Sequence, residues 1–188
     1  MRDDFLVHFG WIGDQFTKHP VEEVFAPGTQ EHAILTQFRD GWGVMDTAQL
    51  LKDLTASYGE RAGQAVEEYI AACLGKNWAA IGERESHEGT EIEDFINVLW
   101  EPLREEGFSF TIERDAGAAA LCVTQCPIYD LAEQTGLHDW VYHLACATDF
   151  YTTPAFSPLI EFTRTKTLVQ GHGCCNHRYC YDQKAAER

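Results

Sequence analysis

Most of the residue types that could carry chemistry fall in the last third of the chain. Six of the seven cysteines lie in or just before it, namely Cys122, Cys126, Cys146, Cys174, Cys175 and Cys180. An odd number of cysteines, in a chain large enough to bury its own core, does not favour a disulfide framework. The roles to weigh are therefore free thiols, catalysis and metal binding.

Two short spacings bring thiols close to groups that can carry a proton. Cys175 and His177 are two residues apart, and residues at that spacing share one face of a strand. A thiolate there could act as a nucleophile, with the imidazole moving the proton. Cys146 precedes Asp149 by three residues, and on a helix both side chains would face the same side.

A zinc site is the alternative use of the same residues. Cys126, Cys146, Cys175 and His177 form a Cys3His set, a combination that suits zinc. The spacing is unlike that of a zinc finger, because no Cys-x2-Cys pair occurs and tertiary structure alone would have to gather the ligands. Four protein ligands would make the site structural, whereas three ligands and a water could activate that water for hydrolysis.

Helices are expected over the first 106 residues. Asp46 and Thr47 can cap a segment with Leu50, Leu51 and Leu54 on one face, and Gly59 can end it. A second helix from residue 60 and a third from residue 90 show the same apolar spacing.

Beyond Gly107 the apolar residues alternate with polar ones. We expect a hairpin over 108–124 with its turn at 115–117, helices over 127–135 and 138–150, and strands over 160–169 and 177–181. The predicted fold class is α+β, with an N-terminal helical half followed by a small antiparallel sheet and two intervening helices.

Length and charge limit the architecture and the partners. The chain has 188 residues, 45% of them hydrophobic, which favours a single domain over 1–188, with 1–106 mainly helical and 107–188 containing the sheet. The net charge of −16 argues against nucleic acid and anionic membranes as partners. No apolar stretch reaches the ~20 residues of a membrane span, and the first residues lack a secretory pattern, so we expect a cytoplasmic protein. A small-molecule substrate is the expected partner, and a homo-oligomer is left open.

Four motifs, taken in order, resemble the L-2-amino-thiazoline-4-carboxylic acid hydrolase family. They are Cys122-x3-Cys126-Pro127, Cys146-x2-Asp149, Arg164-Thr165-x-Thr167 and Gly171-x3-Cys175-Asn176-His177. The resemblance implies a hydrolase of cysteine metabolism that opens a C–N bond of a cyclic amidine such as 2-aminothiazoline-4-carboxylate, with no cofactor required. Asn176 departs from the family pattern, which commonly has Asp there, and the change removes a charge.

The implied reaction suggests a role for each candidate residue. A carboxylate can pair with an amidinium or accept a proton from water, and a guanidinium can grip a substrate carboxylate. The expected catalytic residues are Asp149, Cys175, His177 and Cys146. The expected substrate-binding residues are Arg164, Arg178, Cys126, Thr165 and Asn176. The alternative function is a non-catalytic sensor that binds a small molecule or a soft metal in the same cysteine-lined pocket.

Overall fold

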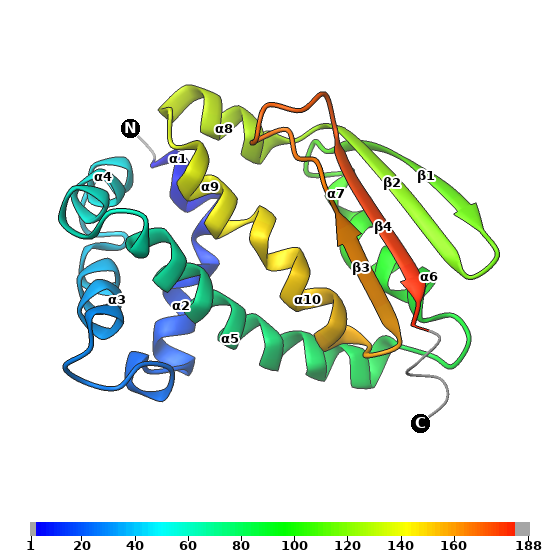
Figure 1. Ribbon diagram of the computed structural model, residues 1–188, viewed down its shortest axis with the longest axis horizontal. Helices are drawn as coiled ribbons and strands as arrows, with labels where there is room; N and C mark the ends of the chain where they lie inside the picture. The colour runs from blue at the N-terminus through cyan, green and yellow to red at the C-terminus, as the bar shows by residue number, and fades with distance from the viewer. Residues whose placement is uncertain (1–2, 183–188) are drawn as a thin grey trace. The chain divides into compact units, whose positions relative to one another are not determined.

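The computed structural model describes residues 3–182 (Figure 1). Its helices are α1 (Asp4–Phe9), α2 (Trp11–Lys18), η1 (Val21–Glu23), α3 (Gln30–Gly41), α4 (Thr47–Tyr58), α5 (Arg61–Glu85), α6 (Glu91–Phe95), η2 (Ile96–Trp100), α7 (Glu101–Leu103), α8 (Pro127–Thr135), α9 (His138–Leu144), η3 (Cys146–Thr148) and α10 (Asp149–Phe156). The strands are β1 (Ser109–Asp115), β2 (Ala118–Gln125), β3 (Ile160–Arg164) and β4 (Cys175–Tyr181). Helices come first and a small antiparallel sheet follows, which confirms the predicted α+β class.

The chain divides into two compact units. The first unit comprises Met1–Cys73 and Leu131–Thr148, and the second comprises Leu74–Asp130 and Asp149–Arg188. Helices α5 and α8 each contribute residues to both units. The boundaries differ from the division at residue 106 that the sequence suggested, and the single-domain interpretation stays a prediction.

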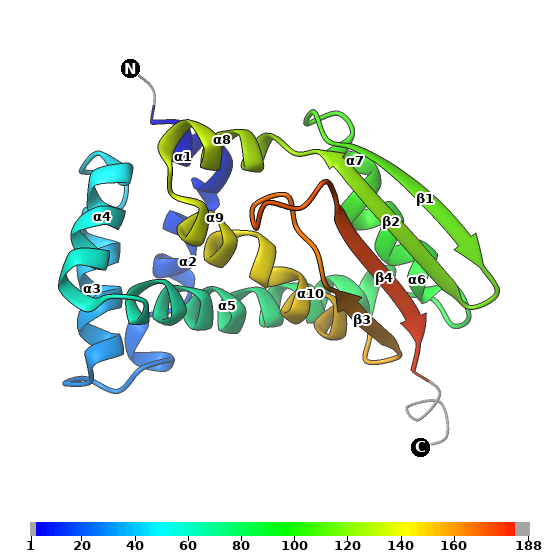
Figure 2. The ribbon, with the colours of Figure 1, turned by 45° about the horizontal axis from the view of Figure 1, so that its top comes forward.

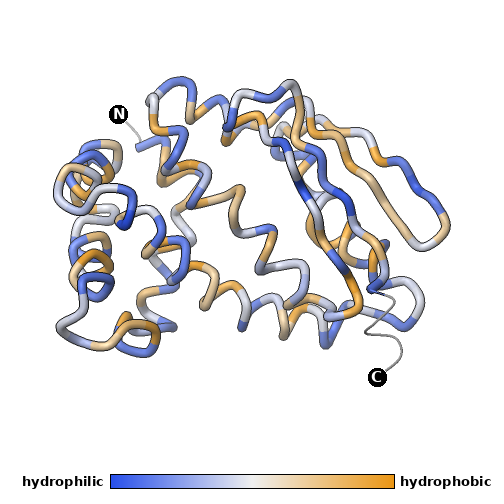
Figure 3. The backbone as a smooth tube through the Cα atoms, viewed as in Figure 1, coloured by the Kyte–Doolittle hydropathy of each residue, from blue (hydrophilic) through white to orange (hydrophobic). Residues whose placement is uncertain are grey.

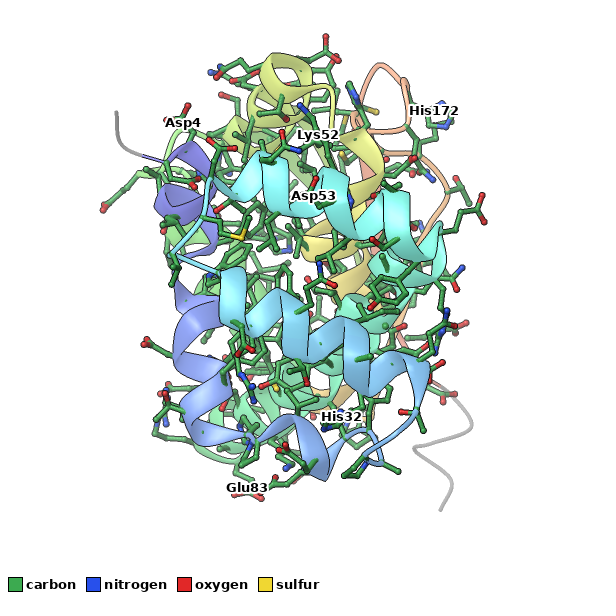
Figure 4. The ribbon with its side chains drawn as sticks, turned by 90° about the vertical axis from the view of Figure 1, so that its left-hand side faces the viewer. Asp4, His32, Lys52, Asp53, Glu83 and His172 are labelled. Carbon is green, nitrogen blue, oxygen red and sulfur yellow. The ribbon has the colours of Figure 1, made fainter. Side chains whose placement is uncertain are left out.

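The first unit is helical, and the expected signals begin and end α4. The Asp46 carboxylate accepts a hydrogen bond from the backbone N–H of Gln49, and Gly59 follows the helix at a φ of 62°. Figure 4 shows Lys52 and Asp53 on the outer side of α4, whereas Leu50, Leu51 and Leu54 are buried. Across residues 3–182 no helix combines the length and the apolar character needed to cross a bilayer.

The second unit is built on a four-stranded antiparallel sheet in the order β1-β2-β4-β3 (Figures 1 and 2). The predicted hairpin is present, with Asp115 opposite Ala118 and a turn that contains Gly117 at a φ of 74°. Only glycine adopts this left-handed conformation readily. Strand β4 pairs with both β2 and β3, so His177 lies opposite Leu121 on one side and opposite Arg164 on the other.

One face of this sheet packs on the apolar core of the second unit. Buried and more exposed residues alternate along β2 and β4, although the colours of Figure 3 show β2 as hydrophobic over most of its length. Figures 1 and 2 show the segment α6-η2-α7 against the sheet. The buried residues that make this core are Ile92, Phe95, Ile96, Trp100, Phe110, Ala119, Leu121, Val123, Phe156, Ile160, Leu168, Cys175 and Tyr179. Alternation therefore leaves the even-numbered residues of β4 on the outer face of the sheet.

The helix predicted over 138–150 is wrong in its second half. Helix α9 ends at Leu144, since Ala145 has a ψ of −66° at a φ of −125°, outside the helical region. A 3₁₀ turn follows at Cys146–Thr148, fastened by a hydrogen bond from Thr148 Oγ1 to the Ala145 carbonyl. A further helix, α10, then begins at Asp149 and was missed because Pro154 interrupts its sequence pattern.

The strand predicted over 160–169 ends at Arg164. Thr167 begins a turn in which its hydroxyl accepts from the N–H of Gln170 and its carbonyl accepts from the N–H of His172. Figure 4 shows His172 on the outside of this connection between β3 and β4. The strand predicted over 177–181 is confirmed and starts two residues earlier, at Cys175.

Candidate active site

A cluster of three polar side chains lies where α10, β3 and β4 meet in the second unit. Oδ2 of Asp149 accepts hydrogen bonds from the Arg164 guanidinium and from Nε2 of His177, the latter at 3.2 Å. Arg164 and His177 are register partners on neighbouring strands, which places both next to the first residue of α10. The structure thus brings together three of the residues that the sequence singled out.

Burial differs sharply within this cluster. The side chains of Arg164 and His177 are 3% and 4% exposed, whereas that of Asp149 is 19% exposed. A buried charge needs a partner, and the guanidinium has one in the carboxylate. Asp149 is the member that a small ligand can reach.

The hydrogen bond from His177 fixes which ring nitrogen carries the proton. An ionised carboxylate only accepts, so Nε2 of His177 donates, and in the neutral ring Nδ1 keeps a lone pair. Nδ1 is buried and has no hydrogen-bond partner among residues 3–182. Both hydrogen bonds that the described residues donate to the Asp149 side chain go to Oδ2.

Aromatic rings surround the cluster. The ring of Trp100 meets that of His177 edge-on, with the ring centres 4.7 Å apart, and the ring of Phe162 stacks on that of His177 at 5.9 Å. The Arg164 guanidinium lies 5.2 Å from the ring centre of Phe150 and 6.0 Å from that of Phe162. Such walls lower the local dielectric, so the interactions of the charged groups are stronger than in water.

Cys175 shares the inward face of β4 with His177, as the spacing predicted. Its side chain belongs to the apolar core, and Sγ accepts a hydrogen bond from the N–H of Leu168 at 3.1 Å. Burial raises the pKa of the Cys175 thiol above its usual range, although Arg164 and the Leu168 N–H act in the opposite direction. This environment favours the thiol over the thiolate that a nucleophile requires.

Two further cysteines were candidates for the site. Cys126 follows β2, packs against the core of the second unit, and has its pKa raised to about 11 by burial. Cys146 lies in η3, which belongs to the first unit. The break after α9 falls at Ala145, before Cys146, and η3 runs directly into α10 at Asp149, so the expectation that Cys146 and Asp149 face the same side stays a prediction.

Arg178 lies on the face of the sheet opposite to Arg164. It is exposed, and it lines an open hollow of about 300 Å³ whose lining also includes Thr163, Arg164 and His177. The two arginines were expected to grip one carboxylate together. The structure does not bring their guanidinium groups to the same side.

Asn176 and Thr165 hold the connection that follows β3. Oδ1 of Asn176 accepts from the N–H groups of Thr165 and Lys166 at 3.1 and 2.7 Å, and its Nδ2 donates to the Thr165 hydroxyl at 2.9 Å. These hydrogen bonds satisfy backbone N–H groups that the sheet ladder would have satisfied had β3 continued. The expected substrate contacts of both residues stay a prediction.

The four residues of the zinc alternative are not gathered. Within the described part of the chain no group of three or more His, Cys, Asp and Glu side chains is arranged to hold a metal ion. Sequence analysis also missed Trp100, Phe150 and Phe162, which enclose the cluster, because aromatic residues at regular spacing predict only a core. The one signal at Trp100 was Pro102, which disturbs the helix beside it.

Comparison with known protein families shows which family the chain resembles. The family described as L-2-amino-thiazoline-4-carboxylic acid hydrolase matches residues 43–179, a range that contains Asp149, Arg164 and His177. No curated protein and no solved structure matches the chain. The match covers well over half of the sequence and agrees with the resemblance carried by the four motifs. The chain therefore belongs to the L-2-amino-thiazoline-4-carboxylic acid hydrolase family.

Proposed function

We propose that this protein hydrolyses a ring C–N bond of a small cyclic amidine that carries a carboxylate, of the 2-aminothiazoline-4-carboxylate class. The family match supports a hydrolase. The single observation that carries the proposal is the arrangement at Asp149, whose Oδ2 is held by two buried donors while the carboxylate itself stays partly exposed. The family match lends no support to a sensor that binds without turnover.

The reaction needs a base near the amidine carbon. Water adds to that carbon and loses a proton, and the ring nitrogen gains a proton as its bond to the carbon breaks. Asp149 Oδ1 is the acceptor for the proton of the water, or the partner of the amidine N–H groups before the attack. Arg164 and His177 hold the carboxylate in one orientation, which is how an enzyme lowers the entropy loss of reaching the transition state.

Cys175 is a core residue in this mechanism, and water is the nucleophile. Its raised pKa and its hydrogen bond from Leu168 favour the protonated thiol. The Arg164 guanidinium is paired with Asp149, and only 3% of the Arg164 side chain is exposed. Its positive charge therefore lies beside the reacting groups. This pairing makes a direct grip of Arg164 on the substrate carboxylate unnecessary to the proposal.

The identity of the product tests which bond breaks. Opening the ring C–N bond of 2-aminothiazoline-4-carboxylate gives an S-carbamoyl derivative of cysteine and no new thiol. Opening the C–S bond gives an N-carbamoyl derivative with one new thiol. NMR of the reaction mixture, with a thiol reagent applied after the protein is removed, separates the two products.

Each outcome of this experiment has a defined meaning. A carbamoyl product without a new thiol supports the proposal, and a product with a new thiol moves the reaction to the C–S bond. No ring opening at any protein concentration contradicts the proposed function. Parallel samples with a chelator, and with zinc added back, show whether turnover depends on a metal ion.

A further inference from the structure

The structure assigns a positioning role to Trp100: we infer that this residue, presented by a π-helical turn, fixes the orientation and the tautomer of His177. The inference rests on the proposed function only where it concerns turnover. Its structural part concerns the His177 ring alone and can be tested without a substrate.

A change of helical period places Trp100 at the cluster. Residues Ile96–Trp100 form the π-helix η2, in which the N–H of Glu101 donates to the carbonyl of Ile96, five residues earlier. Pro102 follows at once and has no N–H to continue a regular α-helical pattern. Single π turns inside helices occur frequently at functional sites.

The wider turn decides which side chain faces the sheet. In a regular α-helix Leu99, four residues after Phe95, would face inward with it. Here Phe95 and Trp100, five residues apart, are both buried, whereas Leu99 is only partly buried. The π turn therefore brings the indole, and not Leu99, against β4.

Two contacts hold the indole in place. Nε1 of Trp100 donates to the hydroxyl of Tyr179 at 3.0 Å, in a hydrogen bond buried from solvent. Its ring also packs edge-on against Phe110 at 5.4 Å. Tyr179 is fully buried and lies two residues after His177 on the same face of β4, so the indole is anchored to the strand that carries the imidazole.

The indole restricts what the His177 ring can do. With Trp100 at its edge and Phe162 on its face, the imidazole is confined between two aromatic walls. A ring flip would exchange Nε2 for a carbon atom next to Asp149 and break the hydrogen bond to Oδ2. The walls therefore maintain the Nε2–H tautomer that Asp149 needs as a donor, a role that groups surrounding a functional histidine often have.

Three variants separate this role from ordinary packing. Trp100→Leu removes the aromatic wall and the N–H donor, whereas Trp100→Phe keeps a smaller aromatic ring and loses the donor. Trp78→Leu is the matched control, because Trp78 packs against Phe95 and Phe156 in the same core and has no ring contact with His177. A comparable loss of stability is expected in both leucine variants.

The direct measurement is the ¹⁵N NMR signature of the His177 ring, recorded on the full chain at a pH where the ring is neutral and assigned by its disappearance in His177→Asn. The wild type, Trp100→Phe and Trp78→Leu should show a single Nε2–H tautomer. Trp100→Leu should show a mixture of tautomers. A single Nε2–H tautomer in Trp100→Leu would overturn the inference, whatever the activity.

Turnover of the thiazoline gives the second measurement. Trp100→Leu should lower kcat by about 10- to 100-fold with little change in KM, as is typical when a group supporting a functional residue is lost. Trp100→Phe should restore most of kcat. Equal losses in Trp100→Leu and Trp78→Leu would overturn the positioning role. Absence of turnover in the wild type would instead defeat the proposed function and leave the NMR result standing.

Discussion

The contact between Gly82 and α10 allows a prediction with a worked magnitude. Gly82 lies in α5 and faces the backbone of Phe156, the last residue of α10. A Cβ at this position would lie 2.7 Å from the carbonyl carbon of Phe156 and 3.0 Å from its Cα. Carbon atoms pack at about 3.5–4.0 Å, so in Gly82→Ala the two helices must separate by about 1 Å.

The same helix offers a control of opposite sign. Gly75 also lies inside α5, and a Cβ there would meet nothing within 4 Å. Gly75→Ala should therefore raise the free energy of unfolding by about 0.5–1 kcal/mol, the usual preference for alanine inside a helix. Gly82→Ala should raise the free energy of unfolding by the same amount through helix preference, but overpacking should lower it by about 1–3 kcal/mol or more. The loss is large because the backbone of Phe156 cannot rotate away from the new Cβ.

Thermal unfolding measures the difference between these variants. The gain is common to both variants, so they should differ by the overpacking loss of about 1–3 kcal/mol, and their Tm values by about 2–12 °C for a chain of this length. Turnover should also fall in Gly82→Ala, by up to about 100-fold, because Asp149 begins the helix that must move. Equal or greater stability of Gly82→Ala relative to Gly75→Ala would refute the close approach of α5 to α10.

Three further predictions concern hydrogen bonds and burial. Asn176→Ala should lower the free energy of unfolding in urea by about 1–3 kcal/mol, because it loses three hydrogen bonds to the connection after β3, whereas Asn176→Asp keeps the accepting oxygen. Cys126 should react with iodoacetamide slowly at pH 8 and faster as the pH approaches its pKa of about 11, as peptide mass spectrometry can follow. Gly63→Ala should displace the His143 ring from its 2.6 Å hydrogen bond with Glu67, a change visible in the NMR shifts of that ring, because a Cβ would lie 2.9 Å from Nε2.

Each of these has an outcome that would contradict it. An Asn176→Ala variant as stable as the wild type would mean that the connection is held by other contacts. Rapid alkylation of Cys126 near neutral pH would show that its thiol is not buried in solution. Unchanged His143 signals in Gly63→Ala would show that the imidazole does not pack over this glycine.

Caps, turn glycines and strand alternation could be predicted from the sequence, because each depends on residues that are close together in the chain. The carboxylate of Asp46, the left-handed Gly59 and the turn at Gly117 each satisfy a backbone requirement within a few residues, and all three are found where the sequence placed them. Alternation along β4 likewise put Cys175 and His177 on one face. Such features need no knowledge of the rest of the chain.

Tertiary contacts decided what the sequence did not show. Threonines and apolar residues between Ile160 and Val169 predict a longer strand, but Asn176 accepts from the N–H groups of Thr165 and Lys166 and the ladder ends at Arg164. The gap between α9 and α10 depends on Ala145, whose sequence carries no stop signal. A pattern of types along the chain cannot reveal either contact.

The candidate site was predicted in its residue types and only partly in its geometry. Asp149, Arg164 and His177 were all named from their motifs, and they meet through one carboxylate oxygen. The pairing of Arg164 with Asp149 was not expected, since a free guanidinium was assigned to the substrate. Arg178 is an even-numbered residue of β4, so it lies on the outer face of the sheet. Strand alternation was applied to Cys175 and His177 but not to Arg178.

The central claim is that the Asp149 carboxylate drives ring opening, and kcat/KM for 2-aminothiazoline-4-carboxylate tests it. Asp149→Asn should lower kcat/KM by about 10²- to 10⁴-fold, the range for loss of a general base. Asp130→Asn, which alters an exposed carboxylate of α8, should leave it unchanged.

Because Asp149→Asn leaves the Arg164 guanidinium buried without its counter-charge, the double variant Asp149→Asn with Arg164→Gln guards against unfolding as the cause. Near-UV circular dichroism confirms that each variant is folded before turnover is measured. The account predicts that folded Asp149→Asn and the double variant both lose activity while Asp130→Asn keeps it. Wild-type kcat/KM in folded Asp149→Asn would contradict the account.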